Sequence, residues 1–280
     1  MIKSFKEIAA SGNTLMVVDA LNLCFSFRGK VNFAEAYVNM VQSLRRSYKA
    51  KYVIIACDKG SSSYRKGIYP EYKQNRKDKF ELQTEAERIQ FEIFFQEFEK
   101  ALTLLEESTE YPLLRFQGVE ADDIGAYICS KIKEFPVVEH TWLITSDGDW
   151  DLLIAESISR FSYVTRKEVT LENWHERYDF EPEDYISIKC LTGDMGDNVI
   201  GVAGIGPKRA ASLVQEYGTA LDIVSSLPID SKYKYVQELN KSKDLIMLNY
   251  NLMDLVTFCA EAIGESNCEI IDNTLTEYLV

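Results

Sequence analysis

The 280-residue sequence predicts an α/β fold, in which a mainly parallel central sheet flanked by helices precedes a smaller all-helical domain. Three short apolar runs that each end in or just beyond an aspartate carry the first part of this prediction: TLMVVDA (14–20), KYVIIACD (51–58) and TWLITSD (141–147). Apolar runs of this length are typical of strands buried on both faces of a parallel sheet. Helical spacing between and after the runs supplies the second part.

Composition bounds the class of protein. Apolar residues make up 46% of the chain, which indicates a globular protein, and no run approaches the ~18 apolar residues that a membrane span needs. The N-terminal MIKSFKEIAASGN lacks the apolar centre of a secretory signal. The six cysteines stand singly, so we expect reduced thiols in a cytoplasmic protein rather than a zinc knuckle or redox pair. With only two histidines, His-based catalysis is disfavoured.

Helices are predicted between the strands, at 33–50, 83–105 and 119–132. The second of these carries an apolar stripe, which we interpret as core packing rather than a cofactor site: Phe91, Phe94, Phe95, Phe98, Leu102 and Leu105. Beyond residue 181 the pattern is helical to about residue 250. The sequence therefore predicts an α/β domain at 1–180 and a helical domain at 181–280, without a clear assignment for 264–280.

Carboxylates gather where the predicted strands end and the helices begin. Asp19 and Asp58 end two strands, GVEADD (118–123) begins a helix, and TSDGDWD (145–151) follows the third strand. Because the carboxyl ends of parallel strands meet at one edge of a sheet, we expect these side chains to converge there. TGDMGDN (192–198) adds a further pair. The resulting set of nine is Asp19, Asp58, Glu120, Asp122, Asp123, Asp147, Asp149, Asp194 and Asp197.

Nine converging carboxylates would repel one another by several kcal/mol unless a cation neutralised them. Without His or Cys in the set, the suitable ions are Mg²⁺ or Mn²⁺, and two such ions about 4 Å apart are the usual means of hydrolysing a phosphodiester. Taken singly, each group also has an ordinary explanation. Acidic residues suit the first turn of a helix, Asp149 suits a helix cap, and Asp194 and Asp197 suit a turn.

Charge and glycine placement indicate contact with nucleic acid despite a net charge of −13. Residues 59–79 hold seven basic and two acidic side chains, whereas 80–110 hold nine acidic and two basic ones. YPEYKQNRK (69–77) offers an aromatic ring beside cations, although a solvated loop would have the same composition. GVAGIGPKRA (201–210) predicts a tight turn followed by a helix N-terminus that carries two cations. Such a turn could bind a backbone phosphate, or it could be an ordinary helix–turn–helix corner.

In chain order, these segments resemble the motifs of the structure-specific 5′-nucleases, the flap endonuclease/5′→3′ exonuclease family, and above all its phage-encoded members. The resemblance rests on VVDALN, the Asp58 strand end, PEYKQNR, GVEADD, TSDGDWD, GDMGDN and GVAGIGPKR, and extends from about Leu15 to about Asp254. It implies a PIN/resolvase-like nuclease core, a helical arch at about 70–105, and a helix-three-turn-helix containing a helix-hairpin-helix at about 185–218.

The resemblance also implies roles for individual residues. The first metal ion would be held by Asp19, Asp58, Glu120, Asp122 and Asp123, and the second by Asp147, Asp149, Asp194 and Asp197. Lys73 and Arg76 would be the catalytic cations at the base of the arch. Contacts with the nucleic acid would come from Tyr72, which stacks on a base, and from Lys189, Gly204, Gly206, Lys208 and Arg209.

The implied activity is cleavage of branched, flapped or nicked DNA with a 5′ single strand, leaving 5′-phosphate and 3′-hydroxyl ends. The implied cofactor is Mg²⁺, at two or more ions per active site, with Mn²⁺ as a substitute and K⁺ at the helix-hairpin-helix. We expect a monomer that removes 5′ flaps and primers during phage DNA replication in the host cytoplasm. The sequence shows neither a sliding-clamp motif nor a fused polymerase module.

Two other functions fit part of the pattern. A PIN-type Mg²⁺-dependent ribonuclease shares acidic strand ends but lacks GVAGIGPKR and the second domain. A non-catalytic module that binds duplex DNA would keep the basic segments and have inert carboxylates. Cleavage of flap DNA compared with single-stranded RNA separates the first alternative, and metal-dependent turnover separates the second.

Overall fold

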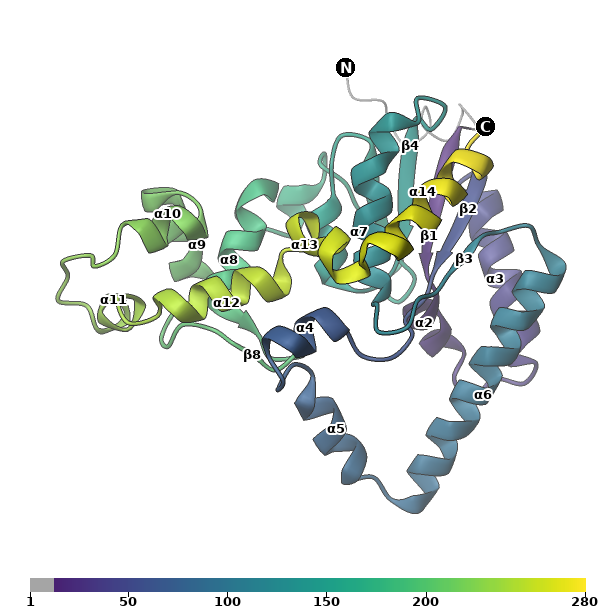
Figure 1. The fold of residues 1–280 in the computed structure, drawn as a ribbon, viewed down its shortest axis with the longest axis horizontal. Helices are drawn as coiled ribbons and strands as arrows, with labels where there is room; N and C mark the ends of the chain where they lie inside the picture. The colour runs from purple at the N-terminus through teal and green to yellow at the C-terminus, as the bar shows by residue number, and fades with distance from the viewer. Residues whose placement is uncertain (1–12) are drawn as a thin grey trace. The chain divides into compact units, whose positions relative to one another are not determined.

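The structure, a computed structural model, describes residues 13–280, so the segment on which the expectation of no secretory signal rests lies almost entirely outside it. The chain forms two compact units (Figure 1). The first unit comprises the chain up to Tyr64, Gln83–Leu171 and Cys259–Val280, and the second comprises Arg65–Leu82 and Glu172–Phe258.

A six-stranded sheet forms the centre of the first unit, in the order β3-β2-β1-β4-β5-β6. Its strands are β1 (Thr14–Asp19), β2 (Ala50–Ala56), β3 (Leu113–Leu114), β4 (His140–Ile144), β5 (Ile158–Ser162) and β6 (Lys167–Val169). All neighbouring pairs run parallel except β5 and β6. The three predicted strands are thus the central ones, and the prediction of a mainly parallel sheet is confirmed.

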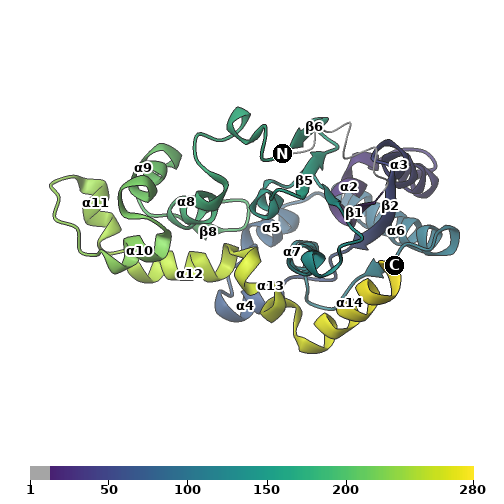
Figure 2. The ribbon, with the colours of Figure 1, turned by 90° about the horizontal axis from the view of Figure 1, so that it is seen from above.

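Helices cover both faces of this sheet (Figure 2). One face packs against α3 (Phe33–Ser47) and α6 (Glu85–Ser108), and the other against α7 (Ala121–Lys131) and α14 (Glu265–Tyr278). The shorter elements are α2 (Ala20–Cys24) and the 3₁₀ turns η1 (Phe25–Phe27), η2 (Ile132–Glu134) and η3 (Gly148–Leu153). Two further helices, α4 (Ser63–Ile68) and α13 (Leu255–Ile263), cross the boundaries between the units.

The apolar stripe of α6 is part of the core, as the sequence predicts. Thr84 and Glu87 form a reciprocal capping box that starts the helix. Phe94 and Phe98 are 3% and 2% exposed and pack with α3 and the sheet in one apolar cluster. This packing fixes α6 against the sheet along its C-terminal half.

The second unit is mainly helical but also contains a short hairpin, which the sequence did not indicate. The hairpin joins β7 (Gly193–Asp194) to β8 (Val199–Ile200) in antiparallel pairing. The remaining elements are α5 (Gln74–Glu81), η4 (Trp174–Glu176), η5 (Pro182–Asp184), α8 (Tyr185–Thr192), α9 (Pro207–Tyr217), α10 (Ala220–Ser225), α11 (Lys234–Leu239) and α12 (Lys243–Met253).

The last segment of the chain, residues 264–280, for which the sequence provides no clear assignment, belongs to the first unit. Ile271 and Leu275 of α14 are fully buried, and the Tyr127 hydroxyl of α7 donates to the Asp272 carboxylate at 3.0 Å. All six cysteines are buried, and none of them forms a disulfide with another, as expected. Within residues 13–280, no helix combines the length and apolar character needed to cross a bilayer.

Candidate active site

The register of the sheet brings three acidic strand ends to one edge. Asp19 pairs with Ala56 across β1 and β2, so Asp58 follows two residues beyond the same level. Val18 pairs with Ile144 across β1 and β4, so Asp147 follows three residues beyond that level. β2 and β4 lie on opposite sides of β1, so the strand order reverses direction at this point of the sheet. The carboxyl ends of the strands at such a switch point are where ligands bind in α/β sheets.

Asp19 lies in the interior of this edge, 4% exposed. Its carboxylate accepts from the Thr145 hydroxyl at 2.7 Å and from the Asn22 amide at 3.1 Å. Burial, followed by the negative charges of Asp58 and Asp147, raises the pKa of Asp19 to about 8, although the two hydrogen bonds oppose this rise. A cation bound among Asp19, Asp58 and Asp147 would neutralise this repulsion between their carboxylates.

The start of α7 adds three more carboxylates. Glu120 and Asp123 are 3% and 0% exposed, and the Asp122 carboxylate accepts from the Trp150 indole at 2.6 Å. Glu120 occupies the cap position of α7, yet its side chain makes no capping hydrogen bond. Instead, Asp58 accepts from the Ala121 amide at 3.2 Å. Ordinary helix capping therefore does not explain Glu120.

The loop after β4 is fixed by a buried ion pair. The Arg160 guanidinium of β5 binds the Asp151 carboxylate through two hydrogen bonds of 2.5 and 3.0 Å, and both side chains are at most 1% exposed. A third hydrogen bond runs from Arg160 to the Thr145 carbonyl at 3.0 Å. The Thr145 hydroxyl accepts from the Asp147 amide at 3.1 Å, and the Asp147 carboxylate accepts from the Asp149 amide at 2.9 Å. These contacts orient the loop that carries the predicted ligands.

The donor set suits a hard divalent cation, because every donor is a carboxylate oxygen. Within residues 13–280 as they stand, no group of three or more His, Cys, Asp or Glu side chains has the arrangement needed to hold a metal ion. Asp19 and Asp122 instead accept from the Thr145 hydroxyl and the Trp150 indole. The type of donor fits a metal ion, whereas the present arrangement of the described side chains does not form a coordination site, so the role of each residue as a ligand stays a prediction.

The remaining two predicted ligands lie in the second unit, on the β7–β8 hairpin. Asp194 accepts from Lys189 at 3.3 Å and from the Gly196 amide at 2.8 Å. Burial alone would raise the pKa of Asp194, but the Lys189 ammonium and these hydrogen bonds lower it below its usual value. Lys189 itself is 7% exposed. In this conformation Lys189 neutralises Asp194. The predicted phosphate contact requires a side chain that faces outward, and Lys189 does not face outward here.

Asp197 lies at the base of the predicted arch and pairs with both predicted catalytic cations. Arg76 binds one carboxylate oxygen at 2.5 Å, and Lys73 approaches the other at 3.6 Å. Lys73 also has a left-handed backbone (φ 55°), and its amide donates to the Asp197 carbonyl at 2.9 Å. The hairpin thus anchors the segment before α5.

Tyr72 is placed differently from the expectation that its ring stacks on a base. The ring is 3% exposed and packs with Val199, Leu252 and Met253. Its hydroxyl donates to Asp197 at 2.8 Å. The structure therefore supports a role in positioning Asp197, since this apolar cluster buries the ring and directs the hydroxyl to the carboxylate.

The predicted helix-hairpin-helix corresponds to α8 and α9, with the β7–β8 hairpin inserted between them. Gly204 has a left-handed backbone (φ 79°), which glycine adopts without strain, and Gly206 caps α9 without a side chain over its free amides. Lys208 is exposed in the first turn of α9. Arg209 folds back, donating to the Gly204 carbonyl at 2.5 Å and lying 4.7 Å above the Tyr235 ring.

Comparison with known proteins agrees with this architecture. Residues 15–179 match the family described as 5′-3′ exonuclease, N-terminal resolvase-like domain, and residues 180–273 match the 5′-3′ exonuclease, C-terminal SAM fold. The flap endonuclease of Escherichia phage T5 is 42% identical over 274 residues, covering 96% of this chain and 93% of its own. The 5′-3′ exonuclease of Halalkalibacterium halodurans is 29% identical over 233 residues, covering 81% and 72%.

Solved structures show the same likeness. The phage T5 protein co-crystallised with metal ions has a TM-score of 0.89 to this chain at 41% identity, covering 95% of this chain and 99% of its own. A complex of the phage T5 flap endonuclease with DNA and metal ions has a TM-score of 0.90 at 40% identity, with the same coverage.

The resolvase-like sheet with its acidic edge, joined to a SAM-type helical domain, defines a nuclease of the 5′-3′ exonuclease class. This chain belongs to that family, as a phage-like structure-specific 5′-nuclease.

Sequence reasoning missed the residues that hold the acidic loop in place. Thr145, Asp151 and Trp150 stand within or beside TSDGDWD, whereas Arg160 lies in a strand that was not predicted. A buried arginine inside an apolar strand is itself an unusual signal, because charged side chains are seldom fully buried without a partner. Arg160 in ISRFS gives that signal in the sequence.

Proposed function

We propose that this protein is a divalent-metal-dependent flap endonuclease and 5′-3′ exonuclease that hydrolyses phosphodiesters in branched, flapped or nicked DNA. One observation carries the proposal: the sheet register gathers Asp19, Asp58 and Asp147 at one edge, where the interior position of Asp19 makes their charges costly without a cation. The phage T5 relatives with bound metal ions and DNA support this reading.

In this proposal, Mg²⁺ supplies the activation of water and the stabilisation of the leaving oxygen, with Mn²⁺ as a substitute. The side chains around it have separate tasks. Asp19, Glu120 and Asp123 would supply oxygen donors from buried positions, where the surrounding protein restricts their movement. The Thr145 hydroxyl donates to the Asp19 carboxylate and accepts from the Asp147 amide, so this one side chain orients both aspartates.

The cations Lys73 and Arg76 would exchange Asp197 for the scissile phosphate when DNA binds. Their present ion pairs are at 3.6 and 2.5 Å, and the Arg76 side chain is 58% exposed, so its exchange costs little desolvation. A phosphate bearing developing charge is a stronger partner than one carboxylate oxygen. The roles of Asp194 and Asp197 in a second metal group are part of the same proposal.

Duplex binding is assigned to the start of α9. The uncapped amides behind Gly206 and the exposed Lys208 would contact backbone phosphates without reading sequence. Carbonyls of the Gly204 turn would hold K⁺ once Arg209 moved to a phosphate. Substrates of this kind arise when 5′ flaps and primers are removed during phage DNA replication, which would place a monomeric enzyme in the host cytoplasm.

The test is product mapping on a labelled 5′-flap duplex with Mg²⁺ and with EDTA. Asp147→Asn removes the charge of one donor while keeping the shape of the side chain. Loss of an outer-shell partner of a metal costs about 10–100-fold, so the rate of flap cleavage should fall by at least that much. Asp179→Asn is the matched control, because Asp179 is exposed and lies outside the acidic edge.

Duplex binding in EDTA should be the same for both variants. Unchanged cleavage in EDTA, or in Asp147→Asn, would refute the metal-dependent mechanism. Preferential cleavage of single-stranded RNA would favour a PIN-type ribonuclease instead.

A further inference from the structure

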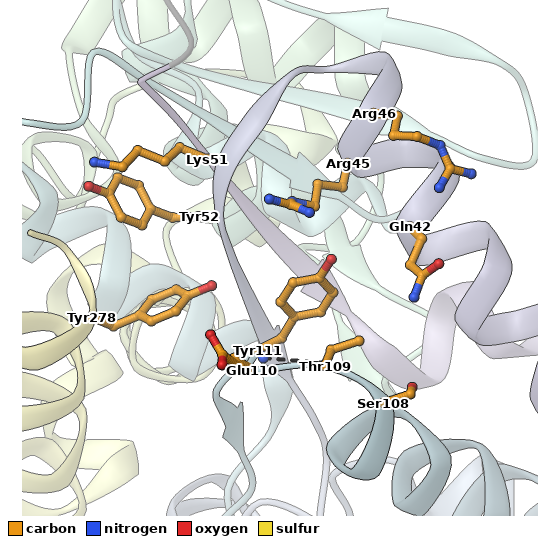
Figure 3. Close-up of a pocket in the computed structure, with 10 residues that line it drawn as sticks. All are labelled: Gln42, Arg45, Arg46, Lys51, Tyr52, Ser108, Thr109, Glu110, Tyr111 and Tyr278. Carbon is orange, nitrogen blue, oxygen red and sulfur yellow. Dashed lines mark hydrogen bonds between the residues drawn. The ribbon is translucent and has the colours of Figure 1, made fainter.

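A polar pocket opens in the first unit at the opposite end of the sheet from the acidic edge. It has a volume of about 590 Å³, within the roughly 300–1,000 Å³ range of small-molecule sites. Its walls come from α3, the start of β2, the end of α6 and the end of α14 (Figure 3). Asp58 follows Lys51 by seven positions along β2 and its extension, or about 23 Å of extended chain.

The charge of the pocket is opposite to that of the whole chain. Arg45, Arg46 and Lys51 line it with a single carboxylate, Glu110, in a protein whose net charge is −13. Across residues 13–280, neither arginine forms an ion pair, and Arg46 makes no side-chain hydrogen bond. The Lys51 ammonium donates to the Val280 carbonyl at 2.9 Å. An anion entering here would therefore meet guanidinium groups that have not been neutralised by carboxylates.

The pocket also carries three tyrosines, two of them half-buried. The Arg45 guanidinium lies 5.9 Å above the Tyr111 ring and donates to the Ala50 carbonyl at 3.2 Å. The Tyr278 hydroxyl accepts from the Val53 amide at 3.2 Å, which fixes that ring beside the cavity. Figure 3 shows Arg45 extending from α3 toward the space that Tyr111 and Tyr278 border. A cation and aromatic faces are thus held side by side before any ligand binds.

We propose that this pocket is a second, non-catalytic site that binds a nucleotide unit, namely a phosphate ester joined to a base. Guanidinium groups match phosphate oxygens in pairs, and tyrosine rings supply faces for a base to stack on. Inorganic phosphate alone would leave most of the cavity unfilled, and an acidic peptide would leave the aromatic faces without a flat partner. The site does not depend on the metal centre or on its predicted ligands.

The ligand has two sources, a free nucleoside 5′-monophosphate or the 5′-phosphorylated end of a single strand. Binding of dAMP, of the tetranucleotide p(dA)₄ and of inorganic phosphate is measured by calorimetry in EDTA, which prevents cleavage. We expect dAMP or p(dA)₄ to bind with a Kd of about 1 mM or tighter and inorganic phosphate more weakly. Tighter binding of p(dA)₄ indicates the strand end, and equal binding indicates the free nucleotide.

Two variants separate this pocket from the other phosphate-binding surfaces. Arg46→Gln should weaken the nucleotide about tenfold by removing a charged contact. Tyr111→Leu should weaken the nucleotide by at least about fivefold while leaving inorganic phosphate unchanged, since only stacking is lost. Lys133→Gln removes the same charge from an exposed site elsewhere in the first unit, and its Kd should stay within about twofold of wild type.

Flap cleavage by all three variants at saturating Mg²⁺ should match wild type, which reports that they are folded. The proposal is overturned if neither dAMP nor p(dA)₄ binds at about 10 mM, or if Arg46→Gln leaves their affinity unchanged. Equal affinity of dAMP and inorganic phosphate, with no effect of Tyr111→Leu, would overturn the nucleotide assignment. Because the assay runs without metal, none of these outcomes depends on whether flap cleavage is confirmed.

Discussion

Replacing Asp151 by asparagine tests whether the buried ion pair holds the acidic loop. The change removes the negative charge that faces Arg160 while keeping the shape of the side chain. Arg160 is 1% exposed, so its charge would lose its partner without gaining water. Breaking a buried pair on one side typically costs about 3–5 kcal/mol. At about 2–4 °C per kcal/mol for a domain of 150–250 residues, Tm should fall by roughly 6–20 °C.

A double-mutant cycle isolates the pair itself. Removing both charges with Asp151→Leu and Arg160→Met together should destabilise less than the sum of the single changes, by about 3 kcal/mol, because no charge is left buried alone. The Thr145 carbonyl loses one donor in both Arg160 variants, so that loss cancels in the cycle. Urea unfolding followed by tryptophan fluorescence supplies the free energies.

The exposed pair Glu238–Lys241 is the matched control, with side chains 35% and 69% exposed at 3.0 Å. Its coupling energy should be below about 1 kcal/mol. Equal coupling in the two pairs would refute the argument that burial makes the Asp151–Arg160 contact strong. Arg160→Met should also raise the Mg²⁺ concentration for half-maximal cleavage by about 10–100-fold, since Thr145 would no longer be fixed.

Three further predictions concern stability and binding. Gly125→Ala places a methyl group 2.4 Å from ring carbons of Trp150 and should destabilise the protein by about 1–3 kcal/mol. Gly67→Ala is the control: its methyl group meets no atom within 4 Å, so this change should stabilise the protein by roughly 0.5–1 kcal/mol. Thermal unfolding compares the two variants. Burial lowers the pKa of His140 from 6.5 to about 4, so the unfolded chain alone takes up the proton as pH falls. The contribution of neutral His140 to the free energy of unfolding is therefore fully present above pH 6.5 and should fall by about 2 kcal/mol at pH 5. Urea unfolding of the His140→Phe variant should not show this loss. Lys208→Gln should lower the slope of duplex affinity against salt by about 0.9, measured in EDTA, and an unchanged slope would exclude a phosphate contact there.

Local pattern was sufficient for the central strands and the long helices. The runs ending near Asp19, Asp58 and Asp147 are mostly apolar, because both faces of those strands are covered. The outer strands escaped prediction for a physical reason: β3 has two residues, and β5 is interrupted by Arg160, whose partner Asp151 makes its burial tolerable. A polar residue in a strand can be interpreted correctly only when its partner is known.

The candidate site shows the same limit. Residue type and position at strand ends predicted where carboxylates converge, since sheet geometry fixes that. Exposure and partners depend on contacts distant in sequence, so Tyr72 was expected to face a base and Lys189 a phosphate. Both face carboxylates of the β7–β8 hairpin instead. A two-residue strand leaves no periodicity to detect, and the hairpin was therefore missing from the prediction.

The return of α14 to the sheet of the first unit has a consequence for how the chain folds during synthesis. The Val53 amide and the Tyr278 hydroxyl that it contacts are separated by 225 positions. A ribosome delivers β2 long before α14, so part of one face of the sheet waits for its cover until α14 has been synthesised. The helical second unit, whose residues are all delivered before then, is free to fold first. Pulse-labelling nascent chains of increasing length would reveal this inverted order, with the N-terminal unit gaining protease resistance only after the second unit.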